Sequence, residues 1–473
     1  WTVATGETIF TGFARAWRGF APIFIMFTIL GWIAPGWGRA SGLALKALLV
    51  GPEHNSPDTL WTCITFALVA LALFGPKIVY KSVERTIGVL IVIVFVGLVM
   101  VACVVGTADK WKDLAKGAVN VGHIADHGQR HLILPGGFTA ELDQGGAATA
   151  ELLDKFAQAE VPLTGEVKIE PETPGKRWTI RSESERYVIL TAPDGLHVHT
   201  PGISIRALFI ALVFAGAGGT ANLFYTFYLR DKHIGMGARM TEMQNPLRGT
   251  TEKVPSTGFT YPDTPENASR FRSWWLFIRH DQLIFFWLLN TVTILLFIFG
   301  ALAVLHPIGQ VPSQGSLIWD QADILGKQWG ATGRTIFLLV GVATLFSTQL
   351  TILDGCARSM ADIVYTNVKR AQNKPVGWWY VMFAAIWIIA GCVITAVMEA
   401  RNVSDLGFLF SAAYMGGFAM AVYVPLTLFI NLKYLPKSAR PGPVCVSMMI
   451  IASLTYVGFA SACLLWELGI LKQ

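Results

Sequence analysis

Charged residues are scarce in this sequence, and the motifs of soluble enzymes are missing from it. Only 14% of the 473 residues are Asp, Glu, Lys or Arg, whereas 53% are hydrophobic, and the mean hydropathy is +0.50. This composition excludes an ordinary soluble domain and a disordered chain. The sequence has no Gly-x-Ser-x-Gly, no Walker sequence, no Cys-x-x-Cys and no haem-attachment sequence. We therefore do not expect an enzyme.

Cysteine is also rare, and its placement excludes a disulfide framework in the polar part of the chain. All six cysteines lie in or beside apolar runs, and none lies in the polar segment 107–203. We interpret them as small buried hydrophobic residues. The first residue is Trp rather than Met, and no signal-peptide pattern follows it, which indicates a chain that has lost its beginning.

Long apolar runs dominate what is present. A run of about 18–25 apolar residues can span the hydrocarbon core of a bilayer as a helix. The sequence predicts nine such runs, and the first continues towards Val50 with a kink at Pro35. They cover residues 18–37, 59–75, 86–106, 204–227, 282–305, 334–353, 379–398, 406–430 and 444–466.

The charged residues between these runs predict how the chain crosses the membrane. Lys and Arg cluster in alternate connections, including eight in the loop 228–281, as the positive-inside rule requires for nine crossings. This places Trp1 and 228–281 inside, and 107–203 and the C-terminus outside. The net charge of +6 therefore implies no nucleic-acid partner. We expect a multi-pass protein of the lipid bilayer, with the bacterial cytoplasmic (inner) membrane as its location.

A shift in composition divides the chain into three parts. Residues 1–106 hold the first three runs, and residues 204–473 hold the other six. Between them, the outer segment 107–203 is polar and rich in Gly, Pro and Glu. Alternation over Arg177–Thr200 predicts strands, and a helical piece is expected near Ala147–Ala159. We expect a small β-containing insertion that could contact a partner in a membrane complex.

Five of the nine histidines lie in this outer segment. His123, His127 and His131 follow an i, i+4, i+8 spacing, and His197 and His199 would share one face of a strand. Such spacing can make a metal site. The alternative is that these are exposed polar histidines in a loop. We favour this alternative over a metal site.

The stretch "LVFAGAGGTANLFYTFYLRDK", Leu212–Lys232, is the clearest candidate site. Glycine lowers helix propensity, and a helix broken in the membrane is tolerated where it is buried in protein or lines a cavity. Transporters use such breaks to coordinate cargo. Gly216 and Gly219 would offer carbonyl oxygens, and Thr220 and Asn222 would offer side-chain oxygens. The alternative is close helix packing through small residues.

Part of this stretch, "GGTANLFYTFYLRDK", resembles the sixth helix of the Nramp family of divalent-metal transporters, whose unwound segment reads Met-Pro-His-Asn-Leu-Phe. "ATGETIFTGFARAW" (Ala4–Trp17) is similar to the family's segment between its second and third helices. "VYKSVERTIGVLIVIVFVGLVM" resembles its fifth helix. The nine runs would then be the family's third to eleventh helices. The resemblance implies an all-α polytopic LeuT-type fold of two inverted five-helix repeats.

Departures from the family pattern bear on the cargo. Gly219 stands where the family has a metal-binding Met, and Ala221 stands where it has a His linked to proton movement. The family's first-helix Asp-Pro-Gly-Asn motif does not occur, and 17–50 contains no Asp or Glu. The family's tenth helix usually carries a Gln, but 406–430 contains no Gln or Asn. A thioether selects soft metals, whereas hard cations prefer oxygen ligands and retain water. The pattern is closer to the Nramp-related magnesium transporters.

Charged residues also occur near the inner end of the sixth run. Asp354, Arg358 and Asp362 are spaced i, i+4, i+8 and would share one helix face. The favoured interpretation is a ladder of ion pairs at the inner mouth. The alternative is that Asp354 lines the inner vestibule and attracts cations.

The sequence therefore predicts a membrane transporter of divalent cations, with Mg²⁺ and Mn²⁺ as the candidate ions, without proton coupling and without a bound cofactor. Two alternatives remain open. One is a non-transporting structural subunit derived from a transporter fold, which a native chain beginning at Trp1 would favour. The other is a transporter of an organic solute, which a wide pocket lined by glycine would permit.

Overall fold

A computed structural model describes residues 1–33, 35–75, 79–119, 205–215, 218–241, 255–305, 317–401 and 405–470, and six strands between residues 131 and 199. The chain forms two compact units. Unit 1 comprises Trp1–Val96, Ser204–Val292 and Leu338–Gln473. Unit 2 comprises Gly97–Ile203 and Thr293–Phe337.

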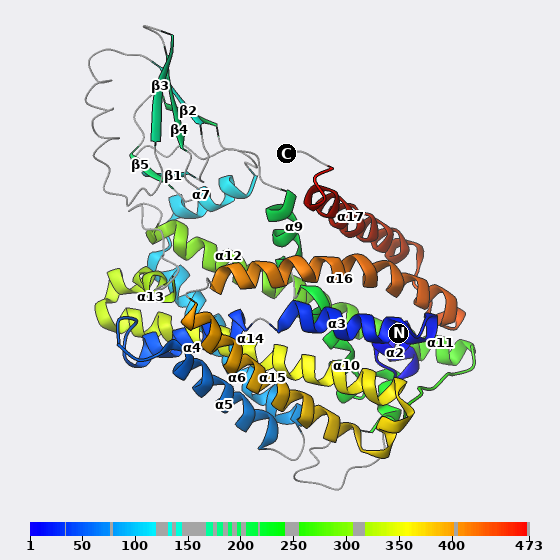
Figure 1. Cartoon of the computed structure of the whole chain (residues 1–473). Helices are drawn as coiled ribbons and strands as arrows, with labels where there is room; N and C mark the ends of the chain where they lie inside the picture. The colour runs from blue at the N-terminus through cyan, green and yellow to red at the C-terminus, as the bar shows by residue number, and fades with distance from the viewer. Residues whose placement is uncertain are drawn as a thin grey trace. The chain divides into compact units, whose positions relative to one another are not determined.

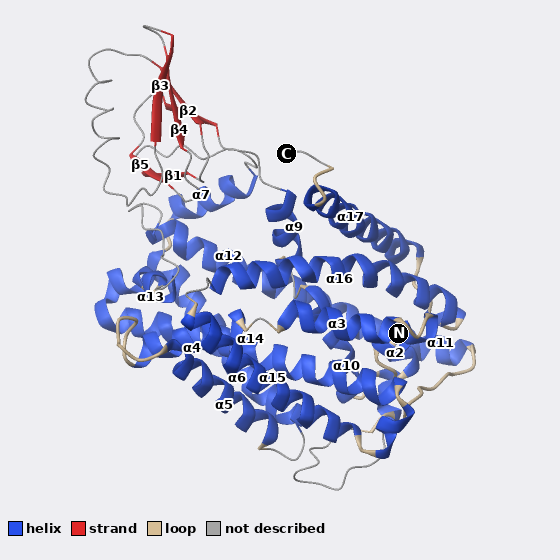
Figure 2. Cartoon of the chain, in the orientation of Figure 1, coloured by secondary structure: helices blue, strands red, loops and turns tan. Residues whose placement is uncertain are grey.

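The regular elements of unit 1 are helices wherever the chain is described, as the blue ribbons of Figure 2 show. The α-helices of the described residues are α1 (Thr2–Thr5), α2 (Ile9–Ala16), α3 (Phe20–Trp32), α4 (Gly36–Leu49), α5 (Asp58–Phe74), α6 (Val79–Val105), α7 (Ala108–Val119), α9 (Ile205–Phe214), α10 (Tyr225–Asp231), α11 (Pro265–Asp281), α12 (Asn290–Gly300), α13 (Leu317–Gln321), α14 (Asp323–Asn367), α15 (Val376–Ala400), α16 (Asp405–Tyr434) and α17 (Pro443–Glu467). Shorter 3-10 turns are η1 (Gly219–Phe224), η2 (Gly235–Arg239), η6 (Lys369–Asn373) and η7 (Lys437–Ala439), and π-helical stretches are η3 (Gln282–Leu289) and η4 (Ala301–Leu305).

Eight helical stretches in the described residues are long and apolar enough to cross a membrane, and they correspond to eight of the nine predicted runs. The remaining run, 59–75, forms α5, which has 17 residues and is shorter than the others. The expected class, a multi-pass α-helical membrane protein, is therefore confirmed. The direction of each crossing stays a prediction.

Large apolar side chains on several of these helices face outwards rather than into the protein. On α17, Met448, Ile451 and Leu454 are each at least 64% exposed, and on α6 the side chain of Val92 is 61% exposed. Contiguous exposed apolar surface marks contact with a membrane or another protein. These faces are suited to lipid.

Two clusters of buried side chains hold unit 1 together. The first joins the α3–α4 region to α5, α14 and α15, and the second joins α2 and α3 to α9, η1, α16 and α17. In Figure 1, α3 (blue) and α16 (orange) run side by side, in agreement with their packing. Fully buried aromatic rings, Phe24 in the second cluster and Phe66 in the first, fill the spaces between helices.

Unit 2 contains the strands β1 (His131–Leu134), β2 (Thr139–Asp143), β3 (Val167–Thr173), β4 (Arg177–Ser182), β5 (Val188–Thr191) and β6 (Leu196–His199). β1 pairs with β5, and the other four form an antiparallel sheet in the order β3-β4-β2-β6. Three strands fall within Arg177–Thr200, where alternation predicts strands. The helical piece expected near Ala147–Ala159 lies outside the described residues, and a separate outer domain stays a prediction.

The contact between α4 and α5 depends on one glycine. A methyl group on Gly42 would lie 2.6 Å from the backbone N and Cα of Thr62, which is closer than packed atoms come. Backbone cannot move aside as a flexible side chain can. The two helices therefore approach so closely because Gly42 lacks a side chain.

Replacing Gly42 by Ala should force these helices apart and lower the free energy of unfolding by about 1–3 kcal/mol. Gly31→Ala is the matched control, because a methyl group there would meet nothing within 4 Å. This substitution should raise the free energy of unfolding by at most about 1 kcal/mol, because alanine has the higher helix propensity. Thermal unfolding of the detergent-solubilised protein measures both. Equal midpoints for the two variants would contradict the close contact.

Candidate functional site

The helix predicted over 204–227 is interrupted, as the sequence indicates. α9 ends at Phe214, and helical structure resumes with η1 at Gly219 and continues into α10. Gly218 and Gly219 have φ angles of 64° and 47°. These lie in the left-handed region, which glycine adopts without the steric cost that other residues incur. The two glycines therefore make the interruption possible.

Gly219 also serves close packing, the alternative that the sequence left open. A methyl group on Gly219 would lie 3.0 Å from Cα of Gly416 in α16. The interrupted segment thus lies directly against the backbone of a neighbouring helix. Backbone at this point is buried in protein, which is where a membrane helix can be broken. Gly216, the other predicted carbonyl donor, lies outside the described residues.

Thr220 and Asn222 both have protein partners. Trp32 Nε1 donates a hydrogen bond to Thr220 Oγ1 at 3.0 Å, and Asn222 Nδ2 donates to the hydroxyl of Tyr423 at 2.9 Å. Thr220 is 1% exposed. The Asn222 bond uses the amide nitrogen, so the amide oxygen is the atom suited to a cation. The structure places both residues on η1, two positions apart.

A second interruption meets the first through Trp32. α3 ends at Trp32, and α4 begins at Gly36 after Pro35, which cannot donate a backbone hydrogen bond. The indole nitrogen of Trp37 donates to the backbone carbonyl of Trp32 at 3.1 Å. This bond satisfies a carbonyl freed at the end of α3. Trp32 therefore contacts both breaks, through its carbonyl on one side and its indole on the other.

Gln349 on α14 is a polar residue that the sequence analysis missed. It is 0% exposed, and neither its Oε1 nor its Nε2 has a hydrogen-bond partner among the described residues. Ser41 on α4 is also 0% exposed, and its hydroxyl has no hydrogen-bond partner among the described residues. A buried polar group without a partner costs about 1–3 kcal/mol. The sequence did offer a signal for Gln349, because it is a single amide side chain within the apolar run 334–353.

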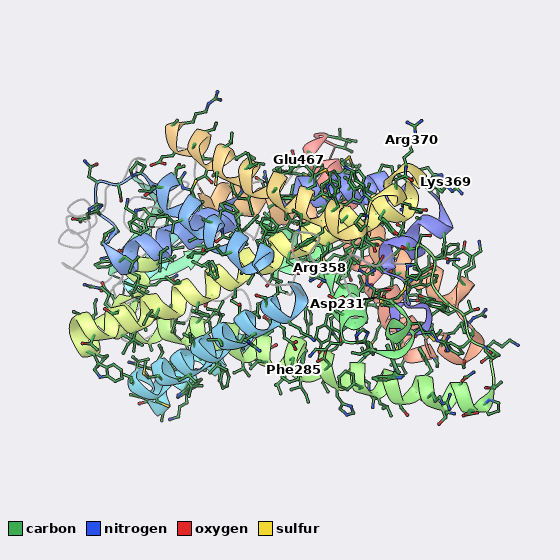
Figure 3. The ribbon with its side chains drawn as sticks, turned by 90° about the horizontal axis from the view of Figure 1, so that it is seen from below. Asp231, Phe285, Arg358, Lys369, Arg370 and Glu467 are labelled. Carbon is green, nitrogen blue, oxygen red and sulfur yellow. The ribbon has the colours of Figure 1, made fainter. Side chains whose placement is uncertain are left out.

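Arg358 joins two carboxylates near the C-terminal end of α14. It contacts Asp231 of α10, and its Nε donates to Asp354 Oδ1 at 2.9 Å. Tyr380 of α15 donates its hydroxyl to the same Asp354 oxygen at 2.7 Å. Asp231 and Arg358 lie next to each other in Figure 3. Asp354 is therefore held by two donors, and its side chain is 13% exposed; its role in an inner vestibule stays a prediction.

The predicted ladder along α14 is present only in part. Arg358 pairs with Asp354, as expected, but Asp362 pairs with Arg230 of α10, at 3.1 Å. Thr8 also donates its hydroxyl to Asp362. The expected contact between Arg358 and Asp362 is wrong for a physical reason. Arg358 is already used by Asp231 and Asp354, and α10 supplies another cation for Asp362.

A different set of charges lies at the other end of α15. Lys46 Nζ is 2.8 Å from Asp58 Oδ1, and Glu399 accepts hydrogen bonds from the backbone N–H groups of Asp58 and Thr59, both at 2.9 Å. Glu399 thus caps the positive N-terminal end of α5. Along α15, Tyr380 and Glu399 are about 28 Å apart at the helical rise of about 1.5 Å per residue. Charged groups therefore lie near both ends of this helix.

Most polar groups near the two interruptions are neutral, but Arg39 on α4 is buried and pairs with Asp58 of the charged set at 3.5 Å. Thr220, Asn222, Gln349 and Ser41 offer hydroxyl and amide groups, and Gly219 offers a carbonyl. Neutral oxygens bind hard cations less strongly than carboxylates do, because they do not neutralise the charge. A site of this kind suits a cation that keeps part of its water or a neutral polar solute.

The predicted histidine site is only partly described. His123 and His127 lie outside the described residues. His131 is in β1, whereas His197 and His199 are in β6, which belongs to the other sheet. In the part of the chain that the structure describes, no group of three or more His, Cys, Asp or Glu side chains is placed to hold a metal ion.

Comparisons with known proteins identify no relative: no family model, no curated protein and no solved structure matches this chain.

Replacing Arg358 by Leu should leave Asp231 and Asp354 buried without their cation. Removing one partner of a buried ion pair costs about 3–5 kcal/mol. Chemical unfolding in mixed micelles measures the loss. Arg270→Leu, which breaks an exposed pair with Glu266, is the control and should change stability by less than about 1 kcal/mol.

If Arg358→Leu does not fold, Tyr380→Phe tests the same cluster, because it removes a single hydrogen bond to Asp354. Its expected loss is about 1–3 kcal/mol. Wild-type stability in both variants would rule out a structural role for these contacts.

Proposed function

We propose that this protein is a transporter that moves a divalent cation across the membrane by alternating access, with an Nramp-like arrangement and a LeuT-type fold. The observation that carries the proposal is the meeting of two interrupted helices at Trp32, with Thr220 on one side and Trp37 on the other. Interrupted helices at membrane depth are a hallmark of transporters, in which the freed ends face the cargo.

The distribution of charge supports the same proposal. Two ion pairs, Asp231–Arg358 and Arg230–Asp362, join α10 to the C-terminal part of α14, and a second charged set surrounds Asp58. The neutral groups of Thr220, Asn222 and Gln349 lie on η1 and α14. Gates that open and close in alternation need groups whose contacts can be exchanged, and ion pairs between different helices provide them. Such a division suits a cargo site with a gate at each end.

The cation is proposed to be Mg²⁺ or a similar hard ion, and Mn²⁺ is a second candidate. The ligands would be the Gly219 carbonyl and the Thr220 and Asn222 oxygens, and the ion would keep several waters, as Mg²⁺ commonly does. Proton coupling is not part of the proposal, because Ala221 replaces the histidine of the resembling family and 17–50 has no acidic residue.

One observation favours the structural-subunit alternative. Both candidate side chains on η1 already have protein partners, Trp32 for Thr220 and Tyr423 for Asn222. A site whose ligands are satisfied by the protein needs no cargo. On this alternative, the segment 107–203 would contact the rest of a membrane complex.

Uptake into proteoliposomes tests the proposal. Proteoliposomes that contain the purified protein should take up Mg²⁺ or Mn²⁺ faster than liposomes without protein. The substitution Asn222→Ala should reduce this uptake at least tenfold, which corresponds to about 1.4 kcal/mol of lost binding free energy. Asn267→Ala is the matched control, because Asn267 lies at the start of α11 and its amide donates to the backbone carbonyl of Pro262 at 3.0 Å, away from η1. Its uptake should equal that of the wild type.

No uptake of either ion by the wild type would contradict cation transport and favour the structural subunit. Uptake that is equal in Asn222→Ala and Asn267→Ala would remove η1 from the cargo site.

A further inference from the structure

Gln349 occupies an unusual position on α14. Its side chain is fully buried, and both atoms of its amide lack a hydrogen-bond partner among the described residues. An amide has two donor hydrogens and an acceptor oxygen, so it can make several hydrogen bonds at once. Buried polar groups are nearly always paired, and an exception calls for a ligand, water or a functional role.

Three threonines on the same helix satisfy their hydroxyl groups with backbone hydrogen bonds. Thr344, Thr348 and Thr351 each donate to a backbone carbonyl four residues earlier, at distances of 2.8–2.9 Å. These hydroxyls are satisfied within α14 and need nothing from outside. Gln349 lies among them but makes no such bond. The amide of Gln349 therefore makes no hydrogen bond to the backbone of α14.

The amide lies beside the second helix interruption. A methyl group on Gly38, the third residue of α4, would be 3.5 Å from Gln349 Nε2 and 2.8 Å from the ring of Phe66. The missing side chain at Gly38 therefore makes room for the ring of Phe66, and the amide of Gln349 lies within ordinary van der Waals reach of the same point of α4. Ser41 follows on the same face of α4, one turn later, and its buried hydroxyl is also unpaired among the described residues.

Two contacts connect this place with η1. Trp37, next to Gly38, bonds to Trp32, and Trp32 bonds to Thr220. On the other side, α14 itself packs on η1, since a methyl group on Gly355 would overlap the ring of Phe224. Gln349 lies about 9 Å before Gly355 along α14 at about 1.5 Å per residue. The unpaired amide and the interrupted segment therefore belong to one neighbourhood of unit 1.

We propose that Gln349 is a cargo-contacting residue of the transport site, and that Ser41 lies beside it on the path of the cargo. This inference rests on the proposed function. The group that binds here both donates and accepts hydrogen bonds, because only such a group satisfies Oε1 and Nε2 together. A bare cation would engage Oε1 and leave Nε2 unpaired. The waters around a hydrated cation satisfy both, because a cation-bound water donates to Oε1 and an outer water with free lone pairs accepts from Nε2.

The test compares Gln349→Leu with the wild type in proteoliposomes, because leucine has a similar size and no polar atoms. Mg²⁺ uptake is measured with and without hexaamminecobalt(III), whose fixed ammine groups imitate a hydrated cation and donate hydrogen bonds. Gln349→Leu should reduce Mg²⁺ uptake at least tenfold and raise the half-inhibitory concentration of hexaamminecobalt(III) at least tenfold. Its melting temperature should equal or exceed that of the wild type, because an unpaired buried amide is removed.

Gln372→Leu is the matched control. Gln372 lies in η6, and its Nε2 bonds to the backbone carbonyl of Tyr365 at 3.3 Å, so uptake and inhibition should stay at the wild-type level. Wild-type behaviour of Gln349→Leu would overturn the contact and leave cation transport standing. A lower melting temperature together with lower uptake would assign the amide to structure and overturn the contact too. An inactive wild type would overturn the proposed function, and the contact with it.

Discussion

The side chain and carbonyl of Trp32 together hold the two interruptions of the bundle. A helix that ends within the membrane exposes backbone groups that lipid cannot satisfy. The carbonyl of Trp32 is one such backbone group and accepts from Trp37, and the indole of Trp32 donates to the side-chain hydroxyl of Thr220 at the other interruption. Without those bonds, the end of α3 and the start of η1 would each carry unpaired polar groups. The breaks are thus mutually dependent rather than separate weaknesses.

The buried charges follow the same rule of satisfaction, through partners from distant parts of the chain. The pair Asp354–Arg358 lies within one helix, so its spacing could be predicted from the sequence. Asp231 and Arg230 could not be assigned in that way, because their partners are more than 120 residues away. Arg230 and Asp231 are adjacent in α10, yet each pairs with a different residue of α14. Consecutive residues on a helix point in different directions, which makes the double pairing possible.

Glycine has two separate uses near the proposed site. At Gly218 and Gly219, positive φ angles turn the chain where α9 stops. At Gly38 and Gly355, the missing side chain leaves room for the rings of Phe66 and Phe224. The first use follows from the cluster of glycines in "GAGGTAN" and could be predicted. The second depends on which ring a neighbouring helix presents, and no pattern within one helix records that.

The sequence by itself determined the membrane class, the positions of the spans and the interruption after Phe214. Each of these depends on composition or on the local cost of glycine in a helix, and both are properties of neighbouring residues along the chain. Only the tertiary structure decided that Thr220 is bonded by Trp32, 188 residues away, and that Gln349 is left without a partner among the described residues. The physical reason is that pairing and burial belong to contacts between helices, and a residue's own sequence neighbours do not specify which helix packs against it.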